Sequence, residues 1–567
     1  MKKEKIICAL LFIFFICNGA LAETFIPEQK IMTINELKPG MSGYALTTIK
    51  GTEPIKIPVR VVSVIPQKPG TTMRDKILIK FTGKNKLAQG MSGSPVFIKN
   101  KLIGGIRSGW ENSDQSIAVV TPIEAMCEIF NQAEIKKEVS EEAEYEFKFF
   151  NLSASGISAN SISRLSKALG LNISQGVSSG SGPLEIKNVN FRPGEAVAAL
   201  LAWGDVEVSA VGTVTATSKD GKFLAFGHDF LNRGAVNYPA AGSFVHETID
   251  SYSFPFKIAS PIYINGVITQ DREAAIGGQT GVFPQSFAAE LNFKNLDTNK
   301  QTKYNFRVIP DEFLTTKLIE EIYKGLITEA WGRKGQGTFD VNLRIEGGNI
   351  PNGFARRDIF FSDDDVVEEA LKDVAEMIGT YLTQPFEHTM PSGFVLTVEA
   401  TQNPRVLRIE DVKVPSDAKP GDEVDIEVKL GAWRSKPIEK IFHLRIPSDA
   451  SGVVEVVVRG GGVDPMPQTA IEEGMKAVDN LQQMLTEFKA ADANNELIIE
   501  LNADRLNLDN IIKKALNDKR EDDDYLPEEL EFLSETKERR IKERNLRIFS
   551  FDYVIDGMMK RIIHLEK

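Results

Sequence analysis

The sequence predicts a mainly β protein with some α-helix, organised as several domains. Its 567 residues exceed what one hydrophobic core usually supports, and 42% of them are hydrophobic, as in folded globular proteins. Short apolar or alternating runs, broken by Gly and Pro, predict strands at 57–62, 77–79 and 116–120. Helical periodicity is confined to fewer stretches, such as 311–327 and 363–384. These observations favour β-barrels or sandwiches with helical additions.

Changes in composition along the chain divide it into segments. A charged stretch and a Gly/Ser-rich stretch separate two β-rich blocks, and strands return after residue 391. The later strands are of the immunoglobulin-like sandwich kind, with a turn at 419–422. We expect a signal peptide at 1–22, a first β-barrel block at 23–135, a linker with a short helix at 136–184, a second β block at 185–350, a helical connector at 351–390, a sandwich at 391–465 and an α/β tail at 466–567.

The N-terminus is typical of a secretory signal peptide. Three lysines precede an apolar run from Ile6 to Cys17, and Ala20-Leu21-Ala22 supplies small residues for cleavage before Glu23. Cleavage would change the formal charge from −12 to −14, because the lost segment carries a net charge of +2. We therefore expect an exported protein, periplasmic or extracellular, with no membrane span in the mature chain.

Composition also argues against several ligands and partners. The acidic chain is a poor match for nucleic acid or anionic lipid. No His/Cys pairs have metal-ligand spacing, and no Gly-rich phosphate loop is present, so we expect neither metal nor cofactor. After loss of Cys8 and Cys17, only Cys127 remains, in the amphipathic segment 122–130, where a buried structural thiol is expected.

Ser92 is the first candidate for chemistry. It lies in Gly90-Met91-Ser92-Gly93-Ser94-Pro95, directly before the strand-like run 96–98. Such a turn can project a serine hydroxyl and point the backbone N–H groups of Gly90 and Ser92 at one oxyanion. A simple surface turn is the alternative, because the same four residues occur at Gly40-Met41-Ser42-Gly43.

A nucleophilic serine needs a base, and the chain has five histidines. His228 follows the apolar segment 223–226 and Gly227, so its imidazole could project from a strand end. His246 reads as a strand residue, and the remaining three histidines lie outside the two β blocks. A hydrogen-bonded turn histidine is the structural alternative for His228.

The acidic partner of the histidine is less well defined. Asp75 precedes the strand 77–79 in the same block as Ser92, and a salt-bridged loop residue is its alternative role. Three other aspartates compete with it: Asp229, Asp250 and Asp271.

Two passages resemble the SpoIVB-type serine peptidases, a bacterial family of the chymotrypsin-like clan. They are 88–96 with 101–105, which resembles the nucleophile segment, and 224–228, which resembles the histidine segment. The resemblance covers about residues 30–300 and implies two chymotrypsin-like β-barrel blocks, with Ser92 as nucleophile and His228 as general base. It also implies that the strand ending at Ser108-Gly109-Trp110 pairs with the substrate backbone. The family's order is His, Asp, Ser, whereas here Ser92 precedes His228.

We therefore expect an exported serine endopeptidase that hydrolyses peptide bonds in a protein or peptide substrate, with Ser92, His228 and Asp75 as its triad. The C-terminal domains would dock an envelope protein partner or restrict access to the cleft. The alternative is a catalytically inactive, peptidase-like envelope protein that binds or assembles partners.

Overall fold

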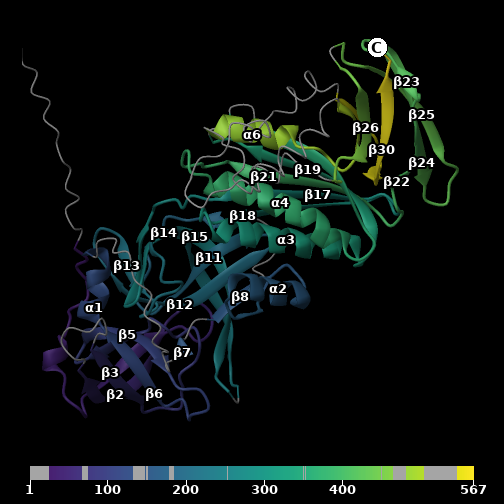
Figure 1. Ribbon diagram of the computed structural model, residues 1–567. Coiled ribbons are helices and arrows are strands. Elements are labelled where there is room, and N and C mark those ends of the chain that lie inside the picture. Colours follow the sequence, from purple (N-terminus) through teal and green to yellow (C-terminus); the bar gives the residue numbers. More distant parts are fainter. Residues whose placement is uncertain are drawn as a thin grey trace, which may run out of the picture. The chain divides into compact units, whose positions relative to one another are not determined.

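The computed structural model is mainly β, as predicted, and divides into two compact units (Figure 1). The first comprises 1–151, 185–199 and 210–284, and the second comprises 152–184, 200–209 and 285–567. The structure describes residues 24–66, 75–131, 147–148, 151–177, 184–251, 253–348, 350, 353–448, 450–463, 480–502 and 546–566. The signal peptide, most of the charged linker and residues 503–545 of the expected α/β tail lie outside these ranges.

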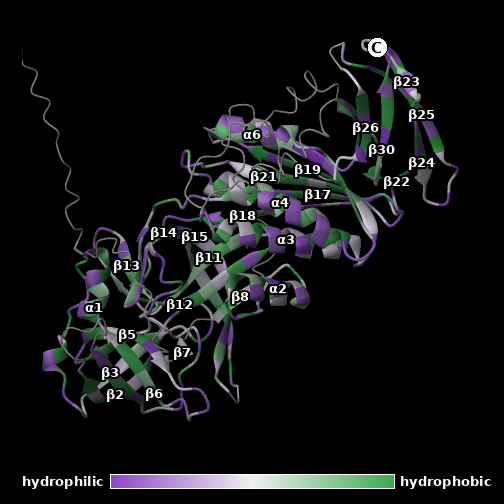
Figure 2. Ribbon diagram, viewed as in Figure 1, coloured by the Kyte–Doolittle hydropathy of each residue, from purple (hydrophilic) through white to green (hydrophobic). Residues whose placement is uncertain are grey.

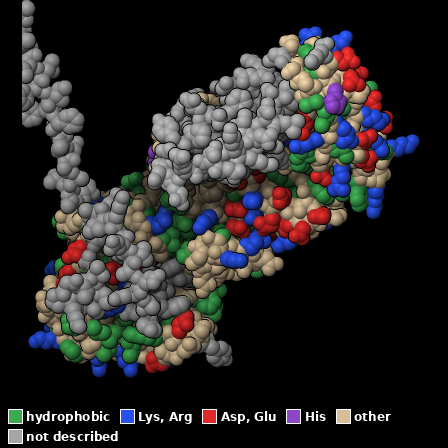
Figure 3. All heavy atoms as spheres, viewed as in Figure 1, with side chains coloured by type: hydrophobic (Ala, Val, Ile, Leu, Met, Phe, Trp, Pro, Cys, Tyr) green, Lys and Arg blue, Asp and Glu red, His purple; other side chains and the backbone are tan. Residues whose placement is uncertain are grey.

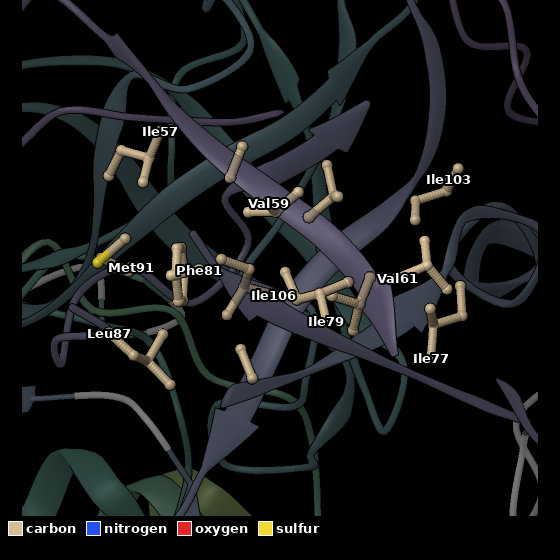
Figure 4. Packing of buried hydrophobic residues seen from close by; sticks show 14 of the residues in the cluster. Ile57, Val59, Val61, Ile77, Ile79, Phe81, Leu87, Met91, Ile103 and Ile106 are labelled. Atoms are coloured by element: carbon tan, nitrogen blue, oxygen red, sulfur yellow. The ribbon is translucent and has the colours of Figure 1, made fainter. Parts of the chain in front are cut away.

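Six strands of the first unit close into a barrel. The pairing order is β4-β1-β2-β3-β6-β5, and β5 pairs back to β4. Alternating residues such as Ile57, Val59 and Val61 fill its interior, as Figure 4 shows. These strands confirm those predicted at 57–62, 77–79, 96–98 and 116–120. Their bounds are β1 Ser42–Thr47, β2 Ile55–Ile65, β3 Lys76–Phe81, β4 Pro95–Ile98, β5 Lys101–Gly109 and β6 Ile117–Pro122.

A second set of strands follows after residue 185. Its pairing order is β11-β14-β15-β16-β13-β12, and the short β10 (Glu185–Ile186) adds to β15. The Ala-rich run at 196–203 forms a buried strand rather than a helix. Figure 2 shows hydrophobic residues concentrated along the strands. The bounds are β11 Ala196–Gly204, β12 Glu207–Thr217, β13 Lys222–Ala225, β14 Gly234–Ile249, β15 Phe256–Arg272 and β16 Ala275–Thr280.

Short helical turns complete the first unit. A 3-10 turn, η1 (Ile34–Glu36), precedes β1, and α1 (Ile123–Cys127) continues into the 3-10 turn η2 (Glu128–Asn131). Cys127 is partly buried at the end of α1, and burial raises the pKa of its thiol to about 12. A thiol of that pKa holds almost no thiolate at neutral pH, which agrees with the structural role expected for Cys127.

The second unit contains a mixed sheet, with both antiparallel and parallel strand pairs, that is covered by helices. Its order is β20-β19-β21-β17-β18; β17 and β21 are parallel, and α3 and α4 pack on the sheet. Charged residues of both signs gather over α3 in Figure 3. The bounds are β8 Asn151–Ser155, α2 Ala159–Leu169, β9 Ile173–Gln175, β17 Phe287–Asn295, β18 Lys300–Val308, α3 Leu314–Trp331, β19 Gly337–Glu346, β20 Phe354–Ser362, α4 Val366–Thr383 and β21 Gly393–Thr401.

The N-cap of α4 is Asp365, the last of three consecutive aspartates. Ser362 and Asp363 are reasonable caps, but the carboxylate of Asp365 accepts from the amides of Val367 and Glu368. The Ser362 hydroxyl instead accepts from the amides of Asp364 and Asp365. Three consecutive aspartates offer equivalent caps locally, and packing of the apolar helix face selects the third.

Two sheets near the C-terminus share one apolar core. Their orders are β25-β24-β22-β29 and β23-β30-β26-β27-β28. The strands come from both segments expected to be separate, the sandwich and the tail, whereas β21 joins the sheet of α3 and α4. The bounds are β22 Val406–Lys413, β23 Asp417–Ala418, β24 Glu423–Ala432, β25 Ile438–Arg445, β26 Val453–Gly460, α6 Leu481–Ala490, β27 Glu496–Asn502, β28 Arg547–Ser550, β29 Val554–Asp556 and β30 Met558–Leu565.

Candidate functional site

The turn that carries Ser92 connects β3 to β4 and is tightly hydrogen-bonded. The amide of Met91 donates to Ala88 O (3.0 Å), and the amide of Ser94 donates to Met91 O (2.9 Å). Gly90 and Gly93 have φ values of 88° and 85°, which residues with a Cβ rarely adopt. The glycines therefore allow the reversal of direction that the sequence predicts at this point.

Two amides of this turn are left without acceptors. The amides of Met91, Gly93 and Ser94 all donate within the protein. The backbone amides of Gly90 and Ser92 donate no hydrogen bond to any described residue. Buried N–H groups are rarely left unpaired, so a pair of them beside a serine suits a site that receives a negatively charged oxygen. They are the two groups named as oxyanion donors from the sequence.

Strand β12 of the second set lies directly against the turn. The amide of Thr213 donates to Ser92 O (2.7 Å), and the hydroxyl of Thr215 donates to Gly93 O (2.6 Å). A Cβ on Gly93 would lie 2.1 Å from Thr213 O and 2.4 Å from Phe226 N. Only glycine permits this approach, so Gly93 is required for contact as well as for its φ.

The chain reaches His228 through an unusual backbone conformation. Phe226 and Gly227 both have φ of 68°, and the hydroxyl of Thr121 in β6 donates to Gly227 O (2.5 Å). A left-handed conformation is uncommon for an aromatic residue and costs on the order of 1–3 kcal/mol, so the surrounding contacts must hold it. The segment therefore fixes the position of His228 at the end of β13, where the sequence places it.

The imidazole of His228 is buried, and one of its contacts defines its tautomer. Nδ1 lies 2.5 Å from the carbonyl oxygen of Asp229. A carbonyl oxygen only accepts, so Nδ1 carries the proton and Nε2 keeps its lone pair in the neutral ring. A general base for a serine hydroxyl needs this tautomer.

Ser92 and His228 each lie near the ring of Phe226 but are not hydrogen-bonded to each other. Neither side chain is exposed, and Ser92 Oγ has no hydrogen-bond partner among the described residues. A Cβ on Gly212 would lie 3.0 Å from Ser92 Oγ and 2.5 Å from the Phe226 ring. The ring of Phe226 is also 5.9 Å from that of His228, centroid to centroid. Ser92 is therefore buried beside Phe226.

The candidate acidic residues occupy different environments. Asp271 is buried and accepts from the amides of Phe230, Leu231 and Arg233, so it holds the loop after His228. Burial raises the pKa of its carboxyl. The other aspartates differ in exposure: Asp229 is buried, Asp250 is exposed, and Asp75 is partly buried at the start of β3. The choice of Asp75 as triad member stays a prediction.

The strand edge predicted to bind substrate is paired within the chain. Ser108 and Gly109, at the end of β5, pair antiparallel with Lys148 and Phe147 of β7 (Phe147–Lys148). Trp110 is 42% exposed, and its carbonyl accepts from the Gln115 side chain (3.0 Å). A backbone segment can thus bind here as an added strand.

One residue of the site was not anticipated from the sequence. Lys257, at the start of β15, is buried, and its Nζ donates to Gly90 O (2.8 Å), Thr47 Oγ1 (3.0 Å) and Thr213 Oγ1 (3.5 Å). Burial lowers the pKa of its ammonium to about 7. Lysines in β strands usually face solvent, so the residue type itself does not predict burial. The signal in the sequence is the apolar residues around it, Phe254, Ile258 and Ala259.

Comparison with protein-family models, curated proteins and solved structures finds no match. Within the described part of the chain, no group of three or more His, Cys, Asp or Glu side chains is placed to hold a metal ion. No described helix combines the length and apolar composition needed to cross a bilayer.

Proposed function

We propose that the chain is a serine hydrolase with two chymotrypsin-like barrels, Ser92 as nucleophile and His228 as general base. The observation that carries this proposal is the pair of acceptor-free amides at Gly90 and Ser92, next to a serine hydroxyl that is itself unbonded. The Nδ1 contact of His228, which leaves Nε2 basic, supports the second role.

The proposed reaction is acyl transfer. His228 Nε2 removes the proton from Ser92 Oγ, which bonds to the substrate carbonyl carbon, while the amides of Gly90 and Ser92 donate to the oxyanion. His228 then returns the proton to the leaving amine as the C–N bond breaks, and water hydrolyses the acyl-enzyme. Because both side chains are buried, Phe226 or a neighbouring segment must move before Ser92 meets substrate.

Within this class, the features favour an exported endopeptidase. The edge of β5 at Ser108–Gly109 already accepts a peptide backbone, that of β7, as an antiparallel strand. An extended peptide substrate would bind the same way by displacing β7 from this edge. The N-terminal signal-like sequence supports export, and the C-terminal sheets, which we take as an immunoglobulin-like sandwich, would dock an envelope partner.

A binding or assembly protein is the second candidate. Two observations favour it: Ser92 is fully buried, and no hydrogen bond joins it to His228. A peptidase-like fold that has lost activity would retain the turn for packing alone. This candidate predicts a serine of ordinary reactivity.

Covalent labelling separates the two candidates. The mature protein is treated with a fluorophosphonate probe, and the labelled residue is mapped by mass spectrometry. We expect labelling at Ser92 that is lost in His228→Ala. His246→Ala is the matched control, because His246 belongs to the same unit and bonds Ser260 instead (2.9 Å). Absence of labelling in folded protein would contradict the hydrolase proposal.

A further inference from the structure

Lys257 holds two successive peptide groups of the Ser92 turn. Its backbone amide donates to Gln89 O (3.0 Å), and its Nζ donates to Gly90 O (2.8 Å). The amide of Gln89 in turn donates to Pro255 O (2.8 Å), so the turn is attached to the start of β15 on both sides of Gln89. Lys257 thus bonds to the carbonyl groups of both Gln89 and Gly90, and the hydroxyl of Thr213 donates to the second of them as well (3.0 Å).

Fixing these carbonyls also fixes the amide of Gly90. In a trans peptide the C=O and the following N–H point in opposite directions. The bond from Lys257 N to Gln89 O therefore turns the Gly90 N–H away from β15. The bond from Lys257 Nζ to Gly90 O holds the next peptide plane, that of the Gly90 carbonyl and the Met91 amide, and so fixes the backbone on the other side of Gly90. An acceptor-free amide would otherwise rotate toward a partner.

The surroundings of the Lys257 ammonium do not explain its burial by charge pairing. The groups that face it are neutral: hydroxyls of Thr47 on β1 and Thr213 on β12, and the Gly90 carbonyl. Burial alone accounts for its lowered pKa, with no carboxylate contributing. By contrast, the buried Lys324 on α3 pairs with Glu320 (2.9 Å) and Glu368 (2.6 Å). An unpaired buried ammonium is destabilising, so a benefit elsewhere is needed to offset it.

We infer that Lys257 is a positioning residue that holds the peptide groups on both sides of Gly90 and so orients the Gly90 amide as an oxyanion donor. The inference rests on the proposed function, since it assigns Lys257 a role at the same site. Lys257 touches neither the nucleophile nor the base, and acts through the Gly90 peptide. Its removal is therefore expected to slow acylation without unfolding the turn.

The test uses Lys257→Met in the mature protein, which keeps the side-chain length and removes the donor. We expect the rate of fluorophosphonate labelling of Ser92 to fall by about 10- to 100-fold. This decrease should not exceed the one caused by removing an oxyanion donor outright. The melting temperature should stay unchanged or rise, because a buried charge is removed. Lys324→Met is the matched control, and should lower the melting temperature without slowing the labelling of the folded protein.

A second readout does not depend on activity. Labelling with ¹³C-carbonyl Gln and ¹⁵N-Gly selects three Gln–Gly peptides, which are Gln89-Gly90, Gln175-Gly176 and Gln336-Gly337. We expect only the Gly90 amide resonance to shift or broaden in Lys257→Met, and none of the three to change in Lys324→Met.

The outcomes separate the inference from the function it rests on. If wild type is not labelled but the Gly90 resonance responds, the hydrolase proposal fails, and with it the oxyanion role of Gly90, while the hold of Lys257 on the Gly90 peptide stands. If Lys257→Met labels within twofold of wild type and Gly90 is unchanged, the positioning role is overturned while the hydrolase stands. A parallel fall in melting temperature and labelling would show a merely structural lysine and would also overturn it.

Discussion

The tetrapeptide Gly-Met-Ser-Gly occurs twice in the first unit and folds alike only at its start. Gly40 and Gly90 have φ of 87° and 88°, and the amides of Met41 and Met91 donate to the residues three positions earlier. After the methionines the copies diverge. Ser42 is exposed and begins β1, whereas Ser92 is buried in a turn before β4.

Their partners explain the difference. The amide of Gly40 donates to Val61 O (2.9 Å), as in any strand-connecting turn, whereas that of Gly90 finds no described acceptor. A Cβ on Gly40 would have nothing within 4 Å, whereas one on Gly90 would meet Lys257 at 3.0 Å. Local sequence thus sets the turn, and the facing strands decide whether its polar groups are satisfied or kept available.

The largest expected effect is on labelling by a serine-directed probe. Ser92→Ala should abolish fluorophosphonate labelling, with a loss on the order of 10⁴-fold or more. Ser42→Ala, the same change in the other copy, should leave the rate unchanged. Mass spectrometry of labelled peptides measures both. Labelling that persists in Ser92→Ala would place the reactive residue elsewhere.

Gly93→Ala should lower the stability of the protein strongly. Gly93→Ala adds a Cβ that would clash with backbone atoms of Thr213 and Phe226, so it should cost about 3 kcal/mol or more in unfolding free energy. Chemical denaturation measures the loss. An effect below 1 kcal/mol would mean that β12 does not pack on the turn as described.

Burial of Lys257 should also make stability depend on pH. Its native pKa of about 7 lies below the unfolded value of about 10.4, so between these limits the unfolded chain binds an extra proton. Unfolding free energy should therefore rise with pH from about 7 to 10, by up to about 4.5 kcal/mol. Denaturation curves at several pH values test this. The rise should disappear in Lys257→Met and persist in Lys324→Met.

The smallest effect is expected at Gly40. Gly40→Ala meets no neighbouring atom and adds only the strain of a left-handed φ, about 1 kcal/mol. The same denaturation experiment compares it with Gly93→Ala. A cost equal to that of Gly93→Ala would contradict the contrast between the two copies.

The sequence predicted the local features of the site well. Gly90 and Gly93 signal the turn, and the run 223–226 with Gly227 signals the strand end before His228, because both depend on neighbouring residues. The strands of both β-rich blocks were recognised for the same reason, as was α3 within a few residues.

Long-range features could not be predicted in this way. Nothing near Lys257 shows that it lies under a turn 167 residues earlier in the chain. The left-handed conformation of Phe226 and the pairing of Ser108 with Lys148 likewise depend on segments brought together by the fold. The pairing of β26 with β30 could not be predicted either, because the sequence of a strand does not show which distant strand it pairs with.

The separation between the Ser92 turn and its supports affects how the protein is made. Thr213 and Lys257, which bond to Gly90, are synthesised 123 and 167 residues after it. During translation the serine turn emerges first, without the strands that hold its peptide groups. A hydrolase built this way would stay inert until the second set of strands has folded. A chain that is exported before folding would gain its reactivity only after leaving the compartment of its synthesis.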